Sequence, residues 1–123
     1  MATILFISGA GLSAESGLRT FRDTDGLWEE YEVMEVCSTQ GFLADRQKVL
    51  DFYDDRRRDL HDKKPNEAHF MMARLKKEFG DEIAILTQNV DDLLERAGCT
   101  DVVHLHGTLT DLRCEACGEV FFV

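Results

Sequence analysis

The sequence predicts an α/β fold in which parallel strands are joined by helices. Three short apolar runs, at residues 3–8, 82–87 and 102–105, have the length of strands and contain β-branched residues. Stretches with helical character separate these runs, so successive strands need crossover connections and are expected to run parallel. The order of strand, helices, strand, helix and strand therefore favours a parallel sheet.

The first run predicts a buried strand because residues 4–7 are all apolar. It leads directly into the glycine-containing residues 9–11. A charge-rich region follows at about residues 40–63, and the spacing of its apolar residues is compatible with helix. These residues are Leu43, Val49, Leu50, Tyr53 and Leu60.

Asn66 is suited to begin a second helix, and Gly80 is suited to end it. Between them an apolar stripe recurs at helical spacing, formed by Ala68, Met71, Met72, Leu75 and Phe79. After the strand at 82–87, residues 91–97 form a short helix with Gly98 in the following position. The third strand ends before His106, and the tail from Leu109 predicts a hairpin around Cys114 and Cys117.

Length and charge restrict the class of protein. The 123 residues suggest one domain or one domain with an appendage, and 24 acidic against 14 basic residues give a net charge of -10. This balance argues against direct binding to nucleic acid or to anionic membranes. No signal or membrane-spanning segment is visible, so four cysteines indicate a reduced, cytoplasmic protein.

A glycine loop follows the first strand. Residues 9–14 (GAGLSA) fit the pattern G-x-G-x-x-G/A, in which glycines allow a tight turn and close approach of the backbone to a diphosphate. The same pattern also occurs in plain strand-to-helix turns. A dehydrogenase needs a second strand and an acidic residue about 20 positions later. Residues 22–31 are polar and turn-rich instead, so a dinucleotide would not bind in the way that it binds to dehydrogenases.

Several short motifs in order resemble the sirtuin family. They are residues 9–13 (GAGLS), 16–22 (SGLRTFR), 26–28 (GLW), 87–91 (TQNVD), 104–107 (HLHG) and 114–117 (CEAC). The resemblance implies a Rossmann-like parallel sheet with helices on both faces, incomplete here, and part of a small zinc-ribbon domain. It places the NAD-binding domain at 1–108, with a helical insertion at about 31–63, and the start of the zinc domain at 109–123. The chain is thus expected to cover only the N-terminal part of the family pattern.

The resemblance implies an NAD-dependent protein lysine deacylase that yields nicotinamide, O-acyl-ADP-ribose and free lysine from acyl-lysine proteins. His106 would be the general base on a ribose hydroxyl, a role that suits imidazole. Without the family context, a lone histidine is more often structural, and we interpret His104 in that way. The residues implied to bind NAD are Gly9, Ala10, Gly11, Ser13, Phe21, Arg22, Gln88, Asn89 and Asp91. Asn89 or Asp91 would also serve as a helix cap, and Arg22 would also suit a carboxylate partner.

Tyr53 and Arg56 lie three residues apart, on one face of the expected helix. They resemble the pair with which some sirtuins hold the distal carboxylate of succinyl- or malonyl-lysine, which a phenol and a guanidinium can grip. Arg19 and Thr20 replace the more common Pro-Asp and resemble bacterial desuccinylase-like members. The small residue sixteen positions before the tyrosine is Cys37 rather than alanine, so acetyl-lysine is expected as a substrate as well.

Cys114 and Cys117 form half of a zinc ribbon, because a structural zinc site needs four ligands. A second chain would complete such a site, and a redox role for the pair is the weaker alternative. Two other functions stay open. One is a catalytically silent module that binds NAD or a partner. The other is a module that dimerises through zinc. The sequence does not define the oligomeric state.

Overall fold

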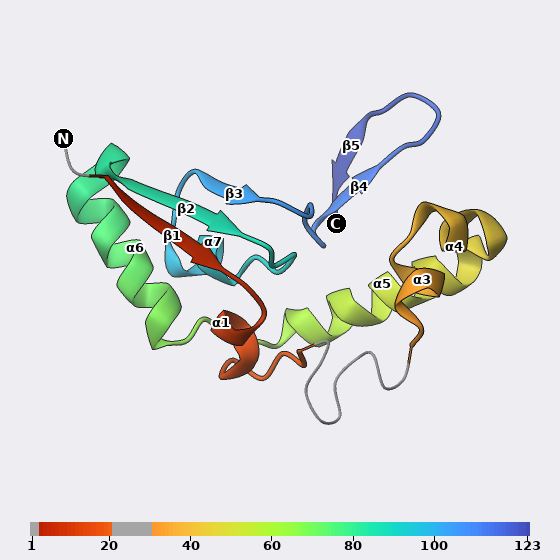
Figure 1. The fold of residues 1–123 in the computed structure, drawn as a ribbon, viewed down its shortest axis with the longest axis horizontal. Coiled ribbons are helices and arrows are strands. Elements are labelled where there is room, and N and C mark those ends of the chain that lie inside the picture. The colour runs from red at the N-terminus through yellow and green to blue at the C-terminus, as the bar shows by residue number, and fades with distance from the viewer. Residues whose placement is uncertain (1–2, 21–30) are drawn as a thin grey trace.

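A three-stranded parallel sheet forms the centre of the computed structural model, which describes residues 3–20 and 31–123 (Figure 1). β2 (Ile83–Thr87) lies between β1 (Ile4–Ser8) and β3 (Val102–His104). Both pairings are parallel, with Thr87 opposite Ser8 on one side and opposite His104 on the other. The predicted α/β class and the three predicted strands are confirmed.

Local capping explains where the two sheet-packed helices begin and end. Asn66 begins α6 (Glu67–Phe79), since its side chain accepts a hydrogen bond from the Ala68 N–H at 2.9 Å. α6 ends at Gly80, which leads into the short 3-10 helix η1 (Gly80–Glu82). α7 (Leu93–Ala97) ends at Gly98, whose φ of 107° is in the left-handed region that favours glycine.

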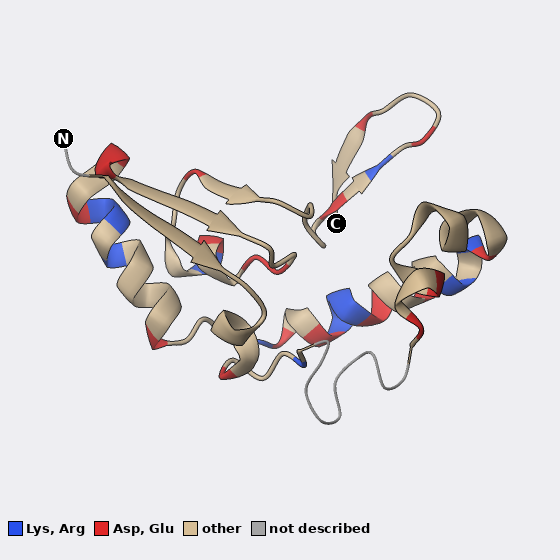
Figure 2. Ribbon diagram, viewed as in Figure 1, with Lys and Arg blue, Asp and Glu red and all other residues tan. Residues whose placement is uncertain are grey.

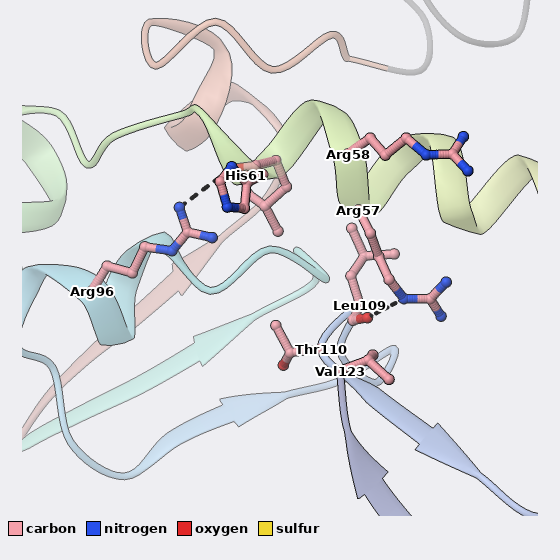
Figure 3. A pocket seen from close by; sticks show the side chains of 8 residues that line it. Arg57, Arg58, His61, Arg96, Leu109, Thr110 and Val123 are labelled. Carbon is pink, nitrogen blue, oxygen red and sulfur yellow. Dashed lines mark hydrogen bonds between the residues drawn. The ribbon is translucent and has the colours of Figure 1, made fainter.

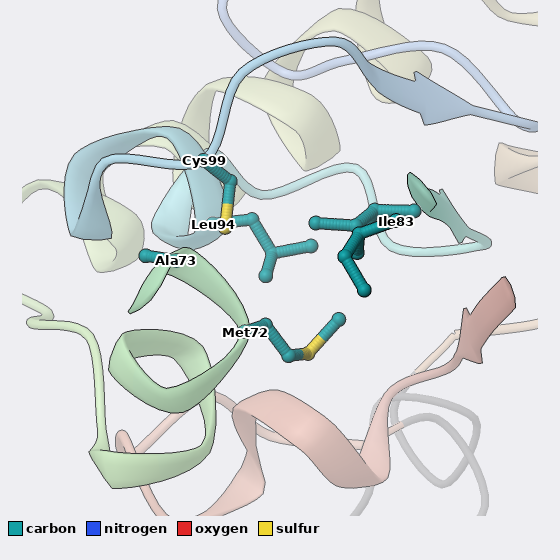
Figure 4. Packing of buried hydrophobic residues seen from close by; sticks show 6 residues of the cluster. Met72, Ala73, Ile83, Leu94 and Cys99 are labelled. Atoms are coloured by element: carbon teal, nitrogen blue, oxygen red, sulfur yellow. The ribbon is translucent and has the colours of Figure 1, made fainter. Parts of the chain in front are cut away.

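The main core lies between these helices and one face of the sheet. Met72 and Ala73 of α6 meet Ile83 and Ile85 of β2, and α7 adds Leu94 (Figure 4). Burying one such aliphatic side chain stabilises the fold by about 1.5–3 kcal/mol. The core therefore fixes the register of the sheet against both helices.

The opposite face of the sheet is open in the part of the chain that the structure describes. Leu5, Ile7 and Val103 are each at least half exposed, at 51%, 67% and 51%. The prediction of a buried first strand is thus wrong for this face, because α6 and α7 both pack on the face of Phe6 and Ile85. Helices on both faces, implied by the family resemblance, are observed on one face among the described residues.

The buried stripe of α6 differs from the predicted apolar one. Met72 is buried as expected, but Met71 and Phe79 are 39% and 45% exposed. Two polar residues occupy the buried face instead. His69 is fully buried, and the Lys76 ammonium donates to the Ile83 carbonyl at 2.7 Å while its stem packs in the core. Hydrogen bonding, and not hydrophobicity alone, therefore determines which face of α6 is turned toward the sheet.

Three helices extend from the sheet in the first connection: α3 (Val33–Val36), α4 (Thr39–Ala44) and α5 (Arg46–His61) (Figure 1). The helix expected at 40–63 is broken at Asp45, whose carboxylate caps α5 by accepting from the Lys48 N–H at 3.1 Å. Val36 and Phe52 form a small separate core. Leu43 and Leu50 of the predicted apolar set are exposed. Acidic and basic segments alternate along α5 (Figure 2).

The C-terminal residues form the expected hairpin. β4 (Asp111–Arg113) pairs antiparallel with β5 (Val120–Phe122), and Cys114 and Cys117 lie in the connection between them. Across the described ranges, no helix has the length and apolar character needed to cross a membrane.

Gly41 is expected to be irreplaceable where α4 approaches α3. A Cβ at this buried position would collide with the backbone oxygens of Met34 and Glu35. We expect Gly41→Ala to lower the free energy of unfolding by about 1–3 kcal/mol, the usual cost of overpacking. Urea denaturation measures the loss, and hydrogen exchange of the Phe42 and Asp45 amides, which bond within this turn, localises it.

Gly11→Ala is the matched control for stability. No atom lies within 4 Å of a Cβ at Gly11, and the residue is helical, so alanine there should leave the unfolding free energy unchanged or slightly raise it. Equal stability of Gly41→Ala and the parent chain would show that α3 and α4 do not approach so closely.

Candidate functional site

The carboxyl ends of the strands open onto a cavity of about 860 Å³. This is the edge at which α/β sheets usually bind ligands, and the volume suits a medium-sized organic ligand. Segments far apart in the sequence line it: the glycine loop, the residues after β2 and β3, and α5. Nine predicted site residues are brought together here: Ala10, Gly11, Ser13, Tyr53, Arg56, Gln88, Asn89, Asp91 and His106.

The glycine loop lines one wall of this cavity. It leads into α1 (Gly11–Ala14), a helix of only four residues. Gly11 borders open space, so its backbone is accessible to a ligand. Gly9 does not line the cavity, but its carbonyl accepts the Asn89 side-chain N–H at 2.9 Å. The loop is therefore tied directly to the residues that follow β2.

A buried hydrogen-bond network holds the polar residues after β2. The Ser13 hydroxyl donates to Asp91 Oδ2 at 2.8 Å, and both residues are more than 90% buried. Asp91 Oδ1 accepts the Leu93 N–H at 3.1 Å, so this carboxylate holds the first N–H of α7, although the residue at the N-cap position is Asp92. A carboxylate fixed by two donors presents a defined orientation to the cavity.

His69 is a member of this network that the sequence reasoning missed. Its Nδ1 accepts the Asn66 N–H at 3.0 Å, so a neutral ring carries its hydrogen on Nε2, which lies 3.4 Å from Ser13 Oγ. Burial lowers the pKa of His69, with the charge of Asp91 opposing it, and this favours the neutral ring. The available signal was a histidine three residues after a helix-capping asparagine.

His106 is exposed and lines the cavity just beyond β3. An exposed imidazole beside a cavity has room to meet a ligand hydroxyl. His104, interpreted as structural, is not among the cavity residues. Its ring is largely buried beside α7 instead.

The α5 wall carries the predicted tyrosine and arginine. The Tyr53 hydroxyl lies 3.4 Å from the Cys37 thiol, and Cys37 also lines the cavity. Burial, together with the contact to Cys37, raises the pKa of Tyr53, so the phenol keeps its proton. Arg56 Nε is a buried donor with no partner among the described residues, and its guanidinium lies 5.5 Å from the Phe52 ring centroid. An unpaired buried donor favours an acceptor supplied by a ligand.

Three described site residues do not line this cavity: Gly9, Cys114 and Cys117. Phe21 and Arg22 lie outside the described residues. Cys114 and Cys117 lie apart, in the hairpin connection, where backbone N–H groups of Cys117 and Ala116 lower the pKa of the Cys114 thiol.

The described residues do not complete a zinc site. No group of three or more His, Cys, Asp or Glu side chains in residues 3–20 and 31–123 is arranged to hold a metal, whereas structural zinc needs four ligands. The zinc half-site at Cys114 and Cys117 therefore stays a prediction.

A second cavity, of about 420 Å³, is lined by three arginines and His61 (Figure 3). Its basic groups already have protein partners. Arg57 Nε donates to the Leu109 carbonyl at 2.7 Å, Arg58 pairs with Asp55, and Arg96 donates to the Leu60 carbonyl. None of the predicted site residues lines this cavity, and its arginines do not need a bound anion to complete their hydrogen bonds.

Comparison with known proteins agrees with this geometry. The Sir2 family pattern matches residues 9–122. An NAD-dependent protein deacylase of Campylobacter jejuni is 63% identical over 121 residues, which cover 98% of this chain and 52% of that protein. An NAD-dependent protein deacylase of Helicobacter pylori is 53% identical over 115 residues, covering 94% and 49%.

The fold shows the same relationship. A solved complex of a Sir2 homologue with NAD has a TM-score of 0.85 and 45% identity, covering 97% of this chain and 46% of that one. The chain spans about half the length of the curated relatives it matches. By its sequence and its fold, as the ordered motifs predicted, the chain belongs to the Sir2 family of sirtuins.

Proposed function

We propose that this chain carries the nicotinamide side of the NAD site and the acyl-lysine site of an NAD-dependent protein deacylase. The observation that carries the proposal is one cavity lined by the glycine loop, residues 88–91, His106 and the Tyr53–Arg56 pair. The names of the bacterial relatives and the NAD-bound Sir2 homologue support it. Acyl-lysine proteins are the proposed substrates.

Asn89 and Asp91 are suited to hold the carboxamide of nicotinamide, and Gln88 the adjoining ribose. The side chains of Asn89 and Asp91 are held by Gly9 and Ser13 respectively, so these polar groups need little reorganisation on binding. NAD supplies the bond between nicotinamide and ribose that is broken in the reaction. The protein then contributes orientation and proton transfer rather than a covalent nucleophile.

His106 is proposed as the general base. As a neutral imidazole it would accept the proton of a ribose hydroxyl, which becomes the nucleophile toward the acyl group. Its exposed position at the cavity permits this contact. Gly9, Ala10, Gly11 and Ser13 are proposed to bind the cofactor from the glycine loop, and the proposed roles of Phe21 and Arg22 remain predictions.

Arg56 and Tyr53 are proposed to select acidic acyl groups. The unpaired Arg56 Nε and the protonated Tyr53 hydroxyl are two donors on one wall, and the carboxylate of a succinyl or malonyl group offers the acceptors that an acetyl group lacks. The boundary between an NAD-binding domain at 1–108 and a small domain at 109–123 stays a prediction.

Replacing His106 tests the proposed chemistry. We expect His106→Ala to reduce nicotinamide release about 10²- to 10⁴-fold, the usual contribution of a general base. The purified chain is incubated with NAD and an acetyl- or succinyl-lysine peptide, and nicotinamide is measured with time.

His61→Ala is the matched control, since His61 is exposed on α5 and does not line this cavity. It should keep the parent rate. Absence of nicotinamide at high concentrations of the parent chain would reject the enzyme for this chain and favour the silent binding module.

Replacing Arg56 tests the acyl preference. We expect Arg56→Met to lower kcat/KM for succinyl-lysine peptide about 10- to 100-fold, because a hydrogen bond to a charged group is lost. The rate with acetyl-lysine peptide should change little. Both rates are measured by peptide mass spectrometry.

Arg58→Met controls for loss of an α5 arginine, because Arg58 is exposed, pairs with Asp55 and does not line the cavity. It should not change the preference. Equal losses of Arg56→Met on both peptides would reject the carboxylate-binding role.

A further inference from the structure

His104 makes two short hydrogen bonds at the end of β3. Its Nδ1 lies 2.7 Å from the Asn89 carbonyl oxygen, and its Nε2 lies 2.5 Å from Glu95 Oε1 on α7. Only 9% of the side chain is exposed. The ring thus joins α7 to the segment that lines the ligand cavity.

The chemistry of these two partners fixes the number of protons. A carbonyl oxygen and a carboxylate only accept hydrogen bonds, whereas a neutral imidazole has one N–H to donate. A neutral ring beside ionised Glu95 would therefore place a lone pair against one of the two oxygens. Both contacts are satisfied only when an additional proton lies between Nε2 and Glu95, which makes the ring an imidazolium.

The charges around the ring favour that proton. The charged groups that face it in the described residues are Glu95 on α7 and Asp91 in the segment after β2, and both are acidic. β2 contributes its register partner Thr87, which is uncharged. Burial lowers the pKa of His104, but the hydrogen bonds to Glu95 and to the Asn89 carbonyl, with the charge of Asp91, raise it by more, so the net pKa is raised.

The backbone carbonyl of Asn89 belongs to a residue whose backbone N–H and side-chain N–H groups are held by other contacts. The Asn89 N–H donates to Thr87 Oγ1 at 3.0 Å, and its side chain donates to the Gly9 carbonyl at 2.9 Å. His104 therefore fixes the orientation of the Asn89 carbonyl. Loss of that contact frees the peptide between Asn89 and Val90, directly beside the cavity-lining side chains of Asn89 and Asp91.

We propose that protonated His104 is a positioning residue, which holds the Asn89 peptide against α7 and makes NAD affinity fall when its proton is lost. The proposal rests on the proposed NAD site, but it assigns the pH dependence of NAD binding to a residue outside the cavity. The linkage has a definite sign. Because the folded protein binds this proton more tightly than the unfolded chain, both contacts are satisfied together at acidic pH, and only one N–H is left for the two acceptors as pH rises through the folded pKa. His106, as a general base, would require the opposite state of its ring.

Two variants separate the two hydrogen bonds. The amide of His104→Asn can donate to the Asn89 carbonyl without a titrating proton, whereas the side chain of His104→Leu donates to neither oxygen. Glu95→Gln keeps the length of the partner side chain but removes its charge. His61→Asn is the control, because His61 is an exposed histidine whose ring pairs with its neighbour Asp62, away from the ligand cavity.

NAD binding is measured by calorimetry with the full chain between about pH 6 and pH 9, the range around histidine titration. We expect the parent affinity to fall about 3- to 10-fold with rising pH, as loss of one hydrogen bond implies. His104→Asn should remove this dependence and retain most of the affinity. His104→Leu should bind weakly at every pH, and Glu95→Gln should move the transition to lower pH. Unchanged affinity and pH profile in His104→Leu would overturn the proposal.

Nuclear magnetic resonance provides a readout that does not depend on NAD. We expect the His104 ring to titrate above an ordinary histidine, and the Val90 amide and the Asn89 side-chain amide to shift with the same midpoint. A ring that titrates normally, or amides that do not follow it, would overturn the proposal. Lack of NAD binding by the parent chain at all pH values would reject the proposed function for this chain, while this titration still decides the role of His104.

Discussion

The parallel register of β2 between its two neighbours is the constraint on which the site depends. Ser8, Thr87 and His104 lie opposite one another across the three strands, and the Ser8 hydroxyl donates to Thr87 Oγ1 at 2.9 Å. Thr87 is fully buried and also accepts the Asn89 N–H. A slip of one residue would turn every β2 side chain to the other face of the sheet. The glycine loop, residues 88–91 and His106 would then no longer meet at one cavity.

The sequence was most informative where local rules decide the structure. The strands, the cap at Asn66, the glycine ends of α6 and α7 and the hairpin around Cys114 all follow from short patterns, and all are observed. The ordered motifs also predicted the residues that converge on the cavity. Their positions were known in the chain, but the resemblance to a family was needed to relate residues as distant as Ser13 and Asp91.

The buried face of α6 and the covered face of β1 depend on contacts that the periodicity of the sequence does not predict. His69 and Lys76 occupy the buried face of α6 because Ser13, Asn66 and the Ile83 carbonyl provide hydrogen-bond partners there. An apolar pattern contains no information about such partners, so the predicted buried face of α6 differs from the observed one. In the same way, the apolar run of β1 indicated a strand but not which of its faces the helices cover.

The three histidines near the strand ends show why residue type alone does not assign a role. His69 faces a backbone N–H, which only donates, and burial lowers the pKa of the ring, which favours its neutral form. His104 faces two acceptors, so the same kind of burial is outweighed and the pKa of the ring is raised. His106, two residues farther on, is exposed at the cavity. The neighbours of each ring, rather than its exposure alone, therefore separate a structural imidazole, a positioning imidazolium and a candidate general base.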